Sequence, residues 1–382
     1  MQFRDLNKQY RLLKPEIDQA MLDAVASGAF IMGKPVKELE TALAEYVGVK
    51  HCISCGNGTD ALTLALKAWN IGQGDAVFVP DFTFFATAEV VSLEGATPVF
   101  VDVDADSFNM DPVCLEKAIQ KTIQEGKLCP KVIITVDLFG LPANYPAIRK
   151  IANKYQLLIL EDGAQGFGGS INGKKACSFG DISTTSFFPA KPLGCYGDGG
   201  AVFTDNDEWA AIMDSLRVHG KGSFKYDNVR IGLNSRLDTI QAAILKVKFK
   251  AFTEYELEKI NEAACFYTEK LKDVVKTPVI PGGYYSSWAQ YTIVLKNREQ
   301  RDALQTSLKE QGIPSMVYYP KALHEQTAYR PLNYQPGSSP VSEMLSECVL
   351  SLPIHPYISE EEINQVVSEI TTYFKYIHHQ LH

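Results

Sequence analysis

A lysine and an aspartate lie in settings that are unusual for solvated charges. Lys191 lies in a loop crowded with aromatic residues, prolines and glycines, from Ser186 to Gly200. Asp162 follows Glu161 at the end of an apolar run. A lone loop lysine is ordinarily a surface charge, and an acidic pair after a strand is ordinarily a turn or a helix cap. The apolar, glycine-rich surroundings of Lys191 favour a functional role for the two residues together.

A carboxylate, a hydroxyl and an amine in this order are the groups that a pyridoxal phosphate (PLP) site needs. The carboxylate of Asp162 would pair with the pyridine nitrogen and keep it protonated, which makes the ring an electron sink. The amine of Lys191 would condense with the cofactor aldehyde and later carry a proton, because a desolvated, cation-rich pocket lowers the pKa of a lysine. We therefore predict Lys191 and Asp162 as catalytic residues.

A candidate phosphate site precedes a strongly apolar segment. Gly58 and Thr59 stand directly before the predicted helix that starts at Asp60 and runs to Ala68. Free amides at the start of a helix bind phosphate oxygens, and a glycine lets the backbone approach closely. The alternative is a simple turn followed by a helix cap, which the residues alone leave open.

Apolar runs alternate with helical stretches in the first part of the chain. The predicted buried strands are Ala76–Pro80, Pro98–Asp102, Val132–Val136 and Leu157–Leu160. The predicted helices between them are Ala86–Leu93, Pro112–Gln124 and Tyr145–Tyr155. This alternation predicts an α/β fold, with a three-layer domain built on a mostly parallel sheet. Ligands of such sheets bind at the carboxyl ends of the strands, where Asp162 and Gln165 lie.

The pattern changes after Asp238. A long helical segment, about Thr239 to Leu271, leads into a region of mixed elements. We predict a large cofactor-binding domain at residues 1–250 and a smaller C-terminal α/β domain at residues 251–382.

Five segments occur in order along nearly the whole chain. They are Gly56-Asn57-Gly58-Thr59-Asp60-Ala61-Leu62, Phe82-Thr83-Phe84, Glu161-Asp162-Gly163-Ala164-Gln165, Ser186-Phe187-Phe188-Pro189-Ala190-Lys191-Pro192-Leu193-Gly194 and Asn234-Ser235-Arg236-Leu237-Asp238. Together they resemble the nucleotide-sugar aminotransferases of the DegT/StrS family, which are fold-type I PLP enzymes. The resemblance is strongest to aminotransferases that act on UDP-linked 2-acetamido-3-oxo-glucuronate.

The resemblance implies further cofactor contacts. Phe84 matches the aromatic residue that stacks on the cofactor ring, although an aromatic residue after a strand is ordinarily core. Gln165 matches the residue that bonds to the ring hydroxyl, and Ser186 a second phosphate donor. Asn234 matches an asparagine that reaches the phosphate of the neighbouring subunit, so the resemblance implies a homodimer with shared active sites.

The resemblance also implies the reaction. The cofactor, as PLP and pyridoxamine phosphate, would carry an amino group from L-glutamate to a 3-keto sugar linked to a nucleotide, for surface polysaccharide such as O-antigen or for other amino sugars. Arg236 would pair with a substrate carboxylate, or alternatively with Asp238 or another local acid. Tyr318 stands where many members have histidine, in a loop that faces the substrate. His324 is a further family-matched pocket residue, although a lone histidine is more often packed or on the surface.

The sequence leaves two other functions open. Amination at C4 of a 4-keto-6-deoxy sugar and a non-catalytic regulatory role both remain as alternatives. Relatives that dehydrate sugars carry histidine in place of the lysine, which Lys191 argues against. The glycines from Gly194 to Gly200 precede a strand instead of following one, which disfavours a dinucleotide site, and no GxxxxGK[ST] motif for ATP occurs.

Composition excludes several classes of protein. The net charge of -8 and the scattered basic residues argue against nucleic-acid binding. No apolar run approaches the ~20 residues of a membrane helix, and Met1 to Asn7 lacks the apolar core of a signal peptide, so we expect a cytoplasmic protein. Cys52 and Cys55 form one close pair among eight cysteines, which cannot complete a zinc site, so we predict no metal.

Overall fold

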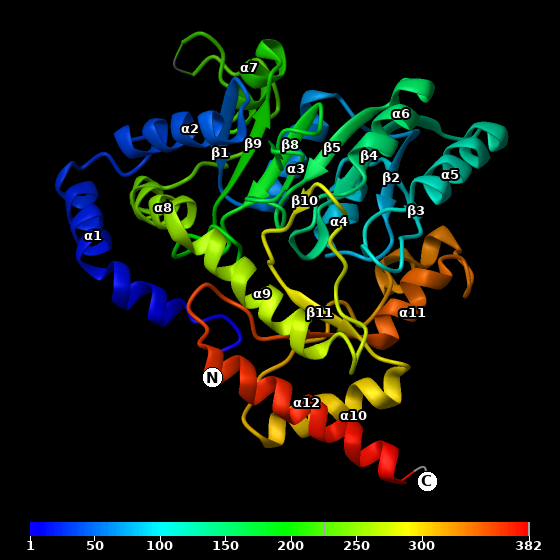
Figure 1. Ribbon diagram of the computed structural model, residues 1–382. Coiled ribbons are helices and arrows are strands. Elements are labelled where there is room, and N and C mark those ends of the chain that lie inside the picture. The colour runs from blue at the N-terminus through cyan, green and yellow to red at the C-terminus, as the bar shows by residue number, and fades with distance from the viewer. Residues whose placement is uncertain (225, 381–382) are drawn as a thin grey trace.

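A seven-stranded sheet forms the centre of the larger part of the molecule (Figure 1). The structure is a computed structural model that describes residues 1–224 and 226–380. The strand order is β1-β9-β8-β5-β4-β2-β3. The strands are β1 (His51–Cys55), β2 (Asp75–Pro80), β3 (Thr97–Val101), β4 (Cys129–Val136), β5 (Leu158–Asp162), β8 (Ile182–Ser186) and β9 (Gly200–Thr204). Strand β9 runs opposite to the other six strands of this sheet, which confirms the predicted mostly parallel sheet.

Helices cover both faces of this sheet. One face packs against α3 (Gly58–Ala68), α4 (Ala86–Leu93) and α7 (Asp207–Leu216). The other packs against α2 (Lys34–Val47), α5 (Pro112–Glu125), α6 (Tyr145–Tyr155) and α8 (Thr239–Ala251). This is the three-layer α/β arrangement of a fold-type I domain.

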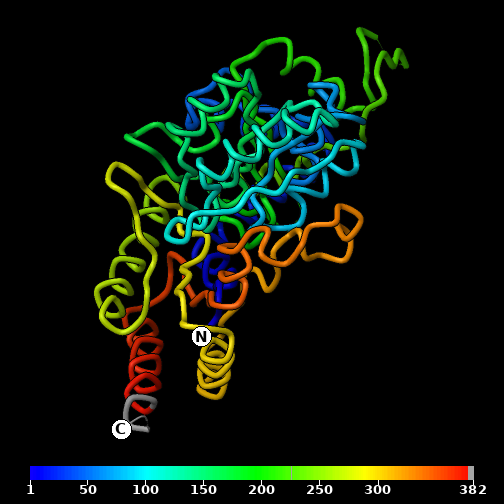
Figure 2. Tube along the Cα trace, turned by 90° about the vertical axis from the view of Figure 1, so that its right-hand side faces the viewer, coloured from blue at the N-terminus to red at the C-terminus, as the bar shows by residue number. Residues whose placement is uncertain are grey.

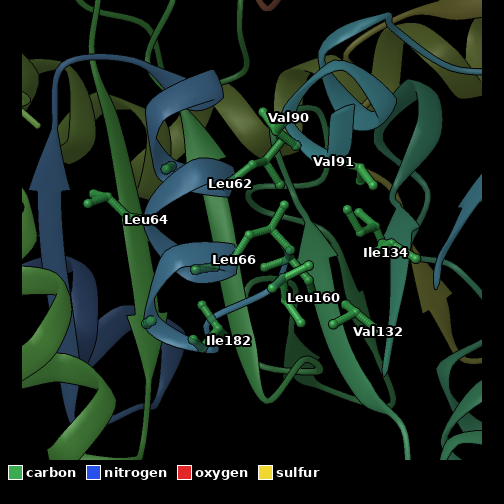
Figure 3. Packing of buried hydrophobic residues seen from close by; sticks show 14 of the residues in the cluster. Leu62, Leu64, Leu66, Val90, Val91, Val132, Ile134, Leu160 and Ile182 are labelled. Atoms are coloured by element: carbon green, nitrogen blue, oxygen red, sulfur yellow. The ribbon is translucent and has the colours of Figure 1, made fainter. Parts of the chain in front are cut away.

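The central strands are apolar on both sides because each side meets a helical layer. Val132, Ile134 and Leu160 point toward the leucines of α3, as Figure 3 shows, whereas Ile133 and Ile159 belong to the opposite core. Burying one such side chain stabilises the fold by roughly 1.5–3 kcal/mol. The sheet is therefore a rigid platform for the residues at its edge.

A helical connection leads to the smaller C-terminal part. The predicted single helix from Thr239 to Leu271 is α8, a π-helical turn (Phe252–Glu256) and α9 (Leu257–Leu271). Beyond it, β11 (Tyr291–Val294) pairs with β12 (Val349–Leu352), and α10 (Arg298–Glu310) and α12 (Glu360–Gln380) pack with α9 around a separate apolar core. The domain boundary after residue 250 remains a prediction.

The remaining elements connect the two parts. The N-terminal helix α1 (Leu6–Ala26) packs on α8, and the Lys8 amine donates to the Tyr357 carbonyl at 2.6 Å. Two short 3-10 helices, Leu323–Glu325 and Thr327–Leu332, precede helix α11 (Pro340–Cys348). A third, Leu138–Gly140, follows β4. A small sheet contains β6 (Ser170–Ile171), β7 (Lys174–Lys175) and β10 (Tyr284–Tyr285). Within the described ranges, every helix is too short or too polar to cross a lipid bilayer.

Candidate active site

Parallel strands bring the predicted site residues to one edge of the sheet. Strands β1, β2, β5 and β8 run in the same direction, so their carboxyl ends meet at the same edge. The predicted cofactor residues follow these four ends in turn: Gly58 and Thr59 after β1, Phe84 after β2, Asp162 and Gln165 with β5, and Ser186 and Lys191 with β8. Ligands of open α/β sheets bind at this edge.

Asp162 is a buried carboxylate at the base of the site. Its side chain accepts the Ala164 amide at 3.2 Å and the Thr87 hydroxyl at 3.0 Å. Burial raises the pKa of Asp162, while the Ala164 amide, the charge of Lys191 and the Thr87 hydroxyl act in the opposite direction. A buried carboxylate of this kind is suited to holding a cation such as a protonated pyridine ring.

Glu161, the other member of the acidic pair, serves the fold. Its carboxylate accepts the amides of Cys177 at 2.5 Å and Phe179 at 2.7 Å, and the Ser183 hydroxyl at 2.7 Å. Successive strand residues point to opposite faces, so Glu161 binds this loop while Asp162 turns toward α4. Glu161 therefore stabilises the loop before β8, whereas Asp162 faces the candidate site.

Lys191 is half-buried in the loop after β8. Its amide donates to the Phe188 carbonyl at 2.8 Å, and its carbonyl accepts the Arg4 guanidinium at 2.9 Å. Burial lowers the pKa of the Lys191 amine, Asp162 opposes that shift, and Arg4 adds to it. The amine is therefore disposed to lose its proton more readily than a surface lysine.

The start of α3 and the end of β8 form a close contact that suits a phosphate group. A Cβ at Gly58 would lie 2.8 Å from Ser186 Cβ and 3.2 Å from Ser186 Oγ, so only glycine fits there. The Asn57 side chain accepts the Asp60 amide at 2.7 Å. The amides of Gly58 and Thr59 precede it in the first turn, where a helix offers no acceptor of its own. These amides and the Ser186 hydroxyl can hold phosphate oxygens.

Phe84 and Gln165 both contact Tyr319. Phe84 keeps 56% of its surface exposed, and its ring centroid is 6.3 Å from that of Tyr319. Gln165 donates to the Tyr319 hydroxyl at 3.1 Å and accepts the Phe139 amide at 2.6 Å. An exposed aromatic face on this edge can stack on a cofactor ring. The bond from Gln165 to a ring hydroxyl stays a prediction.

Asn234 and Arg236 lie outside this group of contacts. The intervening Ser235 turns inward, where its hydroxyl accepts the Gly56 amide at 2.9 Å and donates to Asp60 at 2.6 Å. Asn234 is exposed, and Arg236 donates to its side-chain oxygen. The alternative ion pair of Arg236 with Asp238 is not formed. Arg236 instead lines an open hollow of about 780 Å³ with Lys221 and Arg230.

Tyr318 and His324 differ in their surroundings. The half-buried ring of Tyr318 lies 5.8 Å from that of Tyr319, so it adjoins the site. His324 is only 5% exposed, and it bonds through Nδ1 and through its amide (2.8 Å) to Asp81, with Nε2 3.4 Å from Glu343. These contacts join β2 to the C-terminal part of the chain. A substrate contact for His324 stays a prediction that its burial does not favour.

Thr87 contacts Asp162 and Arg4 contacts Lys191, although no sequence motif predicts either contact. Thr87 lies 75 positions from Asp162, and Arg4 lies 187 positions from Lys191. Neither belongs to a local motif. Their roles depend on the tertiary fold.

The fold and the site together define a fold-type I PLP-dependent enzyme. A model of the DegT/DnrJ/EryC1/StrS aminotransferase family matches residues 12–371, and the chain belongs to that family. This confirms the resemblance described above.

Similar proteins cover almost the whole chain. UDP-2-acetamido-2-deoxy-3-oxo-D-glucuronate aminotransferase from Pseudomonas aeruginosa is 43% identical over 97% of this chain and 99% of its own length. A protein of Geobacillus stearothermophilus named pleiotropic regulatory protein is also 43% identical, over 97% of this chain and 98% of its own. The crystal structure of an aminotransferase of this family from Brucella abortus is 52% identical, with a TM-score of 0.94 over 98% of this chain and 99% of that one.

The family uses PLP, and the residues at the sheet edge fit it. Asp162 is a buried carboxylate that could pair with the ring nitrogen, and Phe84 has an exposed aromatic face that could stack on the ring. Gly58 and Ser186 meet beside open helix amides, as a phosphate requires. The chain is a PLP-dependent aminotransferase of this family.

Proposed function

We propose that the enzyme moves an amino group from L-glutamate to the C3 ketone of a nucleotide-linked sugar, a UDP-linked 2-acetamido-3-keto hexuronate. The main support is the similarity to the Pseudomonas aeruginosa protein, whose name specifies a UDP-linked 2-acetamido-3-oxo-glucuronate as the substrate. The motif from Asn234 to Asp238 supports it, because it resembles that of members that aminate at C3.

The roles of the residues follow from their surroundings. Bound PLP supplies an aldehyde that condenses with amines and a ring that withdraws electrons. Asp162 would hold the ring nitrogen protonated, and Phe84 would orient the ring. The Lys191 amine would take a proton from the α-carbon of glutamate and return one to the sugar carbon, because its lowered pKa makes it an effective base. The Ser186 hydroxyl and the amides of Gly58 and Thr59 would anchor the phosphate.

We further infer that the enzyme works as a homodimer. Apolar side chains are exposed on the segment after α7, which rises away from the body in Figure 2: Phe224 is 66%, Val229 55% and Ile231 90% exposed. Phe30 and Ile31, on the connection between α1 and α2, are each 49% exposed. Exposed apolar side chains in such number favour a protein interface.

The same segment would complete the site of the partner subunit. Within their own chain, Asn234 is exposed and Arg236 lines the open hollow, whereas Ser235 between them bonds to Gly56 and Asp60. In a dimer, Asn234 would reach the phosphate in the neighbouring site, and Arg236 would reach the sugar there. A guanidinium is suited to the carboxylate of a uronate.

Amination at C4 of a 4-keto-6-deoxy sugar is the competing proposal. Tyr318, which adjoins the site in place of the histidine of many relatives, is the residue that favours a different sugar pocket. The test is to load the enzyme with pyridoxamine phosphate and offer paired 3-keto and 4-keto nucleotide sugars, each with and without a C6 carboxylate. Amination of the 3-keto uronate supports the proposal. Amination of only a 4-keto-6-deoxy sugar would overturn it.

The variant Arg236→Ala then tests the carboxylate contact. We expect the preference for the uronate over the matching neutral sugar to fall by about tenfold, the value of one charged hydrogen bond. Lys221→Ala, in the same hollow, is the control. An unchanged preference would remove Arg236 from the proposal and leave the aminotransferase assignment untouched.

We place this reaction in the cytoplasm. The eight cysteines are all unpaired, which suits a reducing compartment. The product would serve surface polysaccharide such as O-antigen, a role that rests on the resemblance alone.

A further inference from the structure

The segment that precedes α1 reaches the loop of the catalytic lysine. Arg4 donates through Nη2 to the Lys191 carbonyl at 2.9 Å and to the Pro192 carbonyl at 3.4 Å. These carbonyls belong to the residues whose backbone fixes where the Lys191 side chain begins. A guanidinium bound to both restricts the loop at that point.

Contacts on both sides hold this segment in place. The Lys8 amine donates to the Tyr357 carbonyl at 2.6 Å, and Gln9 donates to Glu256 at 2.7 Å. The Phe3 ring lies 6.2 Å from the ring of Tyr318. Arg4 is therefore attached to the C-terminal part of the chain while its head group contacts the lysine loop.

Arg4 also brings a positive charge that is not neutralised locally. Burial lowers the pKa of Arg4 to about 10, so it remains charged at neutral pH. Within residues 1–224 and 226–380, the buried Nη1 of Arg4 has no hydrogen-bond partner. Glu256, the acid that acts on it electrostatically, already accepts hydrogen bonds from Gln9 and from the Tyr357 hydroxyl.

We propose that Arg4 is a positioning residue for Lys191, which holds the lysine loop through its backbone carbonyls and keeps a positive charge in the pocket that Lys191 lines. A nearby cation in a desolvated pocket favours the neutral form of a lysine, and the neutral form is the nucleophile and the base. The charge of Asp162 acts in the opposite direction. Arg4 offsets that carboxylate, so that Asp162 can serve the cofactor ring without holding Lys191 protonated.

Four other titratable residues line the pocket that contains Arg4 and Lys191. Lys248 of α8 is 2% exposed and lies in the same pocket, with its pKa lowered to about 8 by burial. Burial lowers the pKa of His355 to about 4, so it is neutral at pH 7. The remaining titratable groups that line this pocket are Asp5 and Tyr357. Asp5 caps α1 by accepting the Lys8 amide at 2.8 Å.

The test measures the protonation of Lys191 without any sugar substrate. Cofactor-free protein is treated with trinitrobenzenesulfonate across a range of pH, and labelling of Lys191 is quantified by mass spectrometry. We expect Arg4→Met and Arg4→Gln to shift the pH midpoint of labelling upward. Arg4→Lys, which keeps the charge, and Arg11→Met, at an exposed position of α1, should keep the wild-type midpoint. A wild-type midpoint in both neutral variants would overturn the proposal.

Two further measurements distinguish the effect of the Arg4 charge from its effect on the lysine loop. In the PLP-bound protein, the pH midpoint of the cofactor absorbance should move upward in Arg4→Met, and kcat should fall about tenfold, as expected for the loss of one charged hydrogen bond. Arg4→Gln keeps an amide donor and replaces Arg4→Met if that variant does not fold. An upward shift in Arg4→Lys as large as in Arg4→Gln would refute the role of the charge. The pH midpoints of labelling and of absorbance do not depend on which sugar is the substrate.

Discussion

The hydroxyl of Thr87 donates to Asp162 Oδ2 across 3.0 Å and joins helix α4 to strand β5 at the base of the site. The Ala164 amide donates to the other carboxylate oxygen at 3.2 Å. Two donors are few for a buried carboxylate, and burial dominates its pKa. The ionised carboxylate of Asp162 therefore lowers the stability of the cofactor-free protein, and it becomes favourable when a cation binds beside it.

We predict that Asp162→Asn stabilises the cofactor-free protein at neutral pH. The folded-state pKa of Asp162 is raised above the ordinary value of 3.8, so the unfolded chain releases this proton at lower pH than the folded chain. The ionised carboxylate then costs stability once the pH has risen above 3.8, and the neutral amide removes that cost. Thermal unfolding should give a higher Tm for the variant at pH 7 and a smaller difference as the pH falls toward 3.8.

PLP should reverse that order, because the wild-type carboxylate pairs with the ring nitrogen and the amide does not. The same variant should lose turnover by about a thousandfold, or about 4 kcal/mol of transition-state stabilisation. Asp111→Asn, at the half-buried N-cap of α5, is a control for the loss of one acid. Near-normal turnover in Asp162→Asn would mean that another acid serves the ring.

We predict that Gly58→Ala weakens cofactor binding. The added Cβ would lie 2.8 Å from Ser186 Cβ, so the start of α3 must move away from β8 and the phosphate donors separate. A rise of about tenfold in the Kd for PLP is expected, or about 1.4 kcal/mol, measured by fluorescence titration. At Gly72 a Cβ would meet its nearest atom at 3.6 Å, so Gly72→Ala is the matched control. Equal Kd values for the two variants would argue against the phosphate site.

We predict a dimer or a larger assembly at working concentrations. Asn234→Ala should retain PLP less well than wild type, with an unchanged Tm of the cofactor-free protein, because the exposed Asn234 side chain bonds only to Arg236 within the described chain. Light scattering measures the assembly, and dialysis followed by absorbance measures the retained cofactor. Asn153→Ala, at an exposed position of α6, is the control. A fully active monomer would exclude shared sites.

Much of the fold could be predicted because local patterns and tertiary structure agree. Helices α4 and α6 begin and end at the predicted residues, and the apolar runs of β2 and β4 lie between two helical layers. The π-helical turn at Phe252–Glu256 could not be predicted. It places the Phe252 ring against Gly168, where a Cβ would lie 2.6 Å from that ring, and this contact has no signal in the helix period.

Some residues of the candidate site could also be predicted from the sequence, and others could not. Asp162 and Lys191 could be predicted because one ends a strand and the other follows one, and strand ends converge at one edge of a parallel sheet. Thr87 and Arg4 could not, because tertiary contacts alone bring them to these residues. The family resemblance predicts His324 as a pocket residue, whereas its burial against Asp81 depends on how the C-terminal part folds over β2.

The central claim is that Lys191 binds the cofactor and carries the transamination. The most direct test is the absorbance spectrum of the purified protein with PLP, before and after addition of L-glutamate. Wild type and Lys127→Ala, at an exposed position, should show the band of the lysine-bound cofactor, which glutamate converts to that of pyridoxamine phosphate. Lys191→Ala should lack the lysine-bound band and show no multiple turnover. A normal band with normal turnover in Lys191→Ala would contradict the assignment.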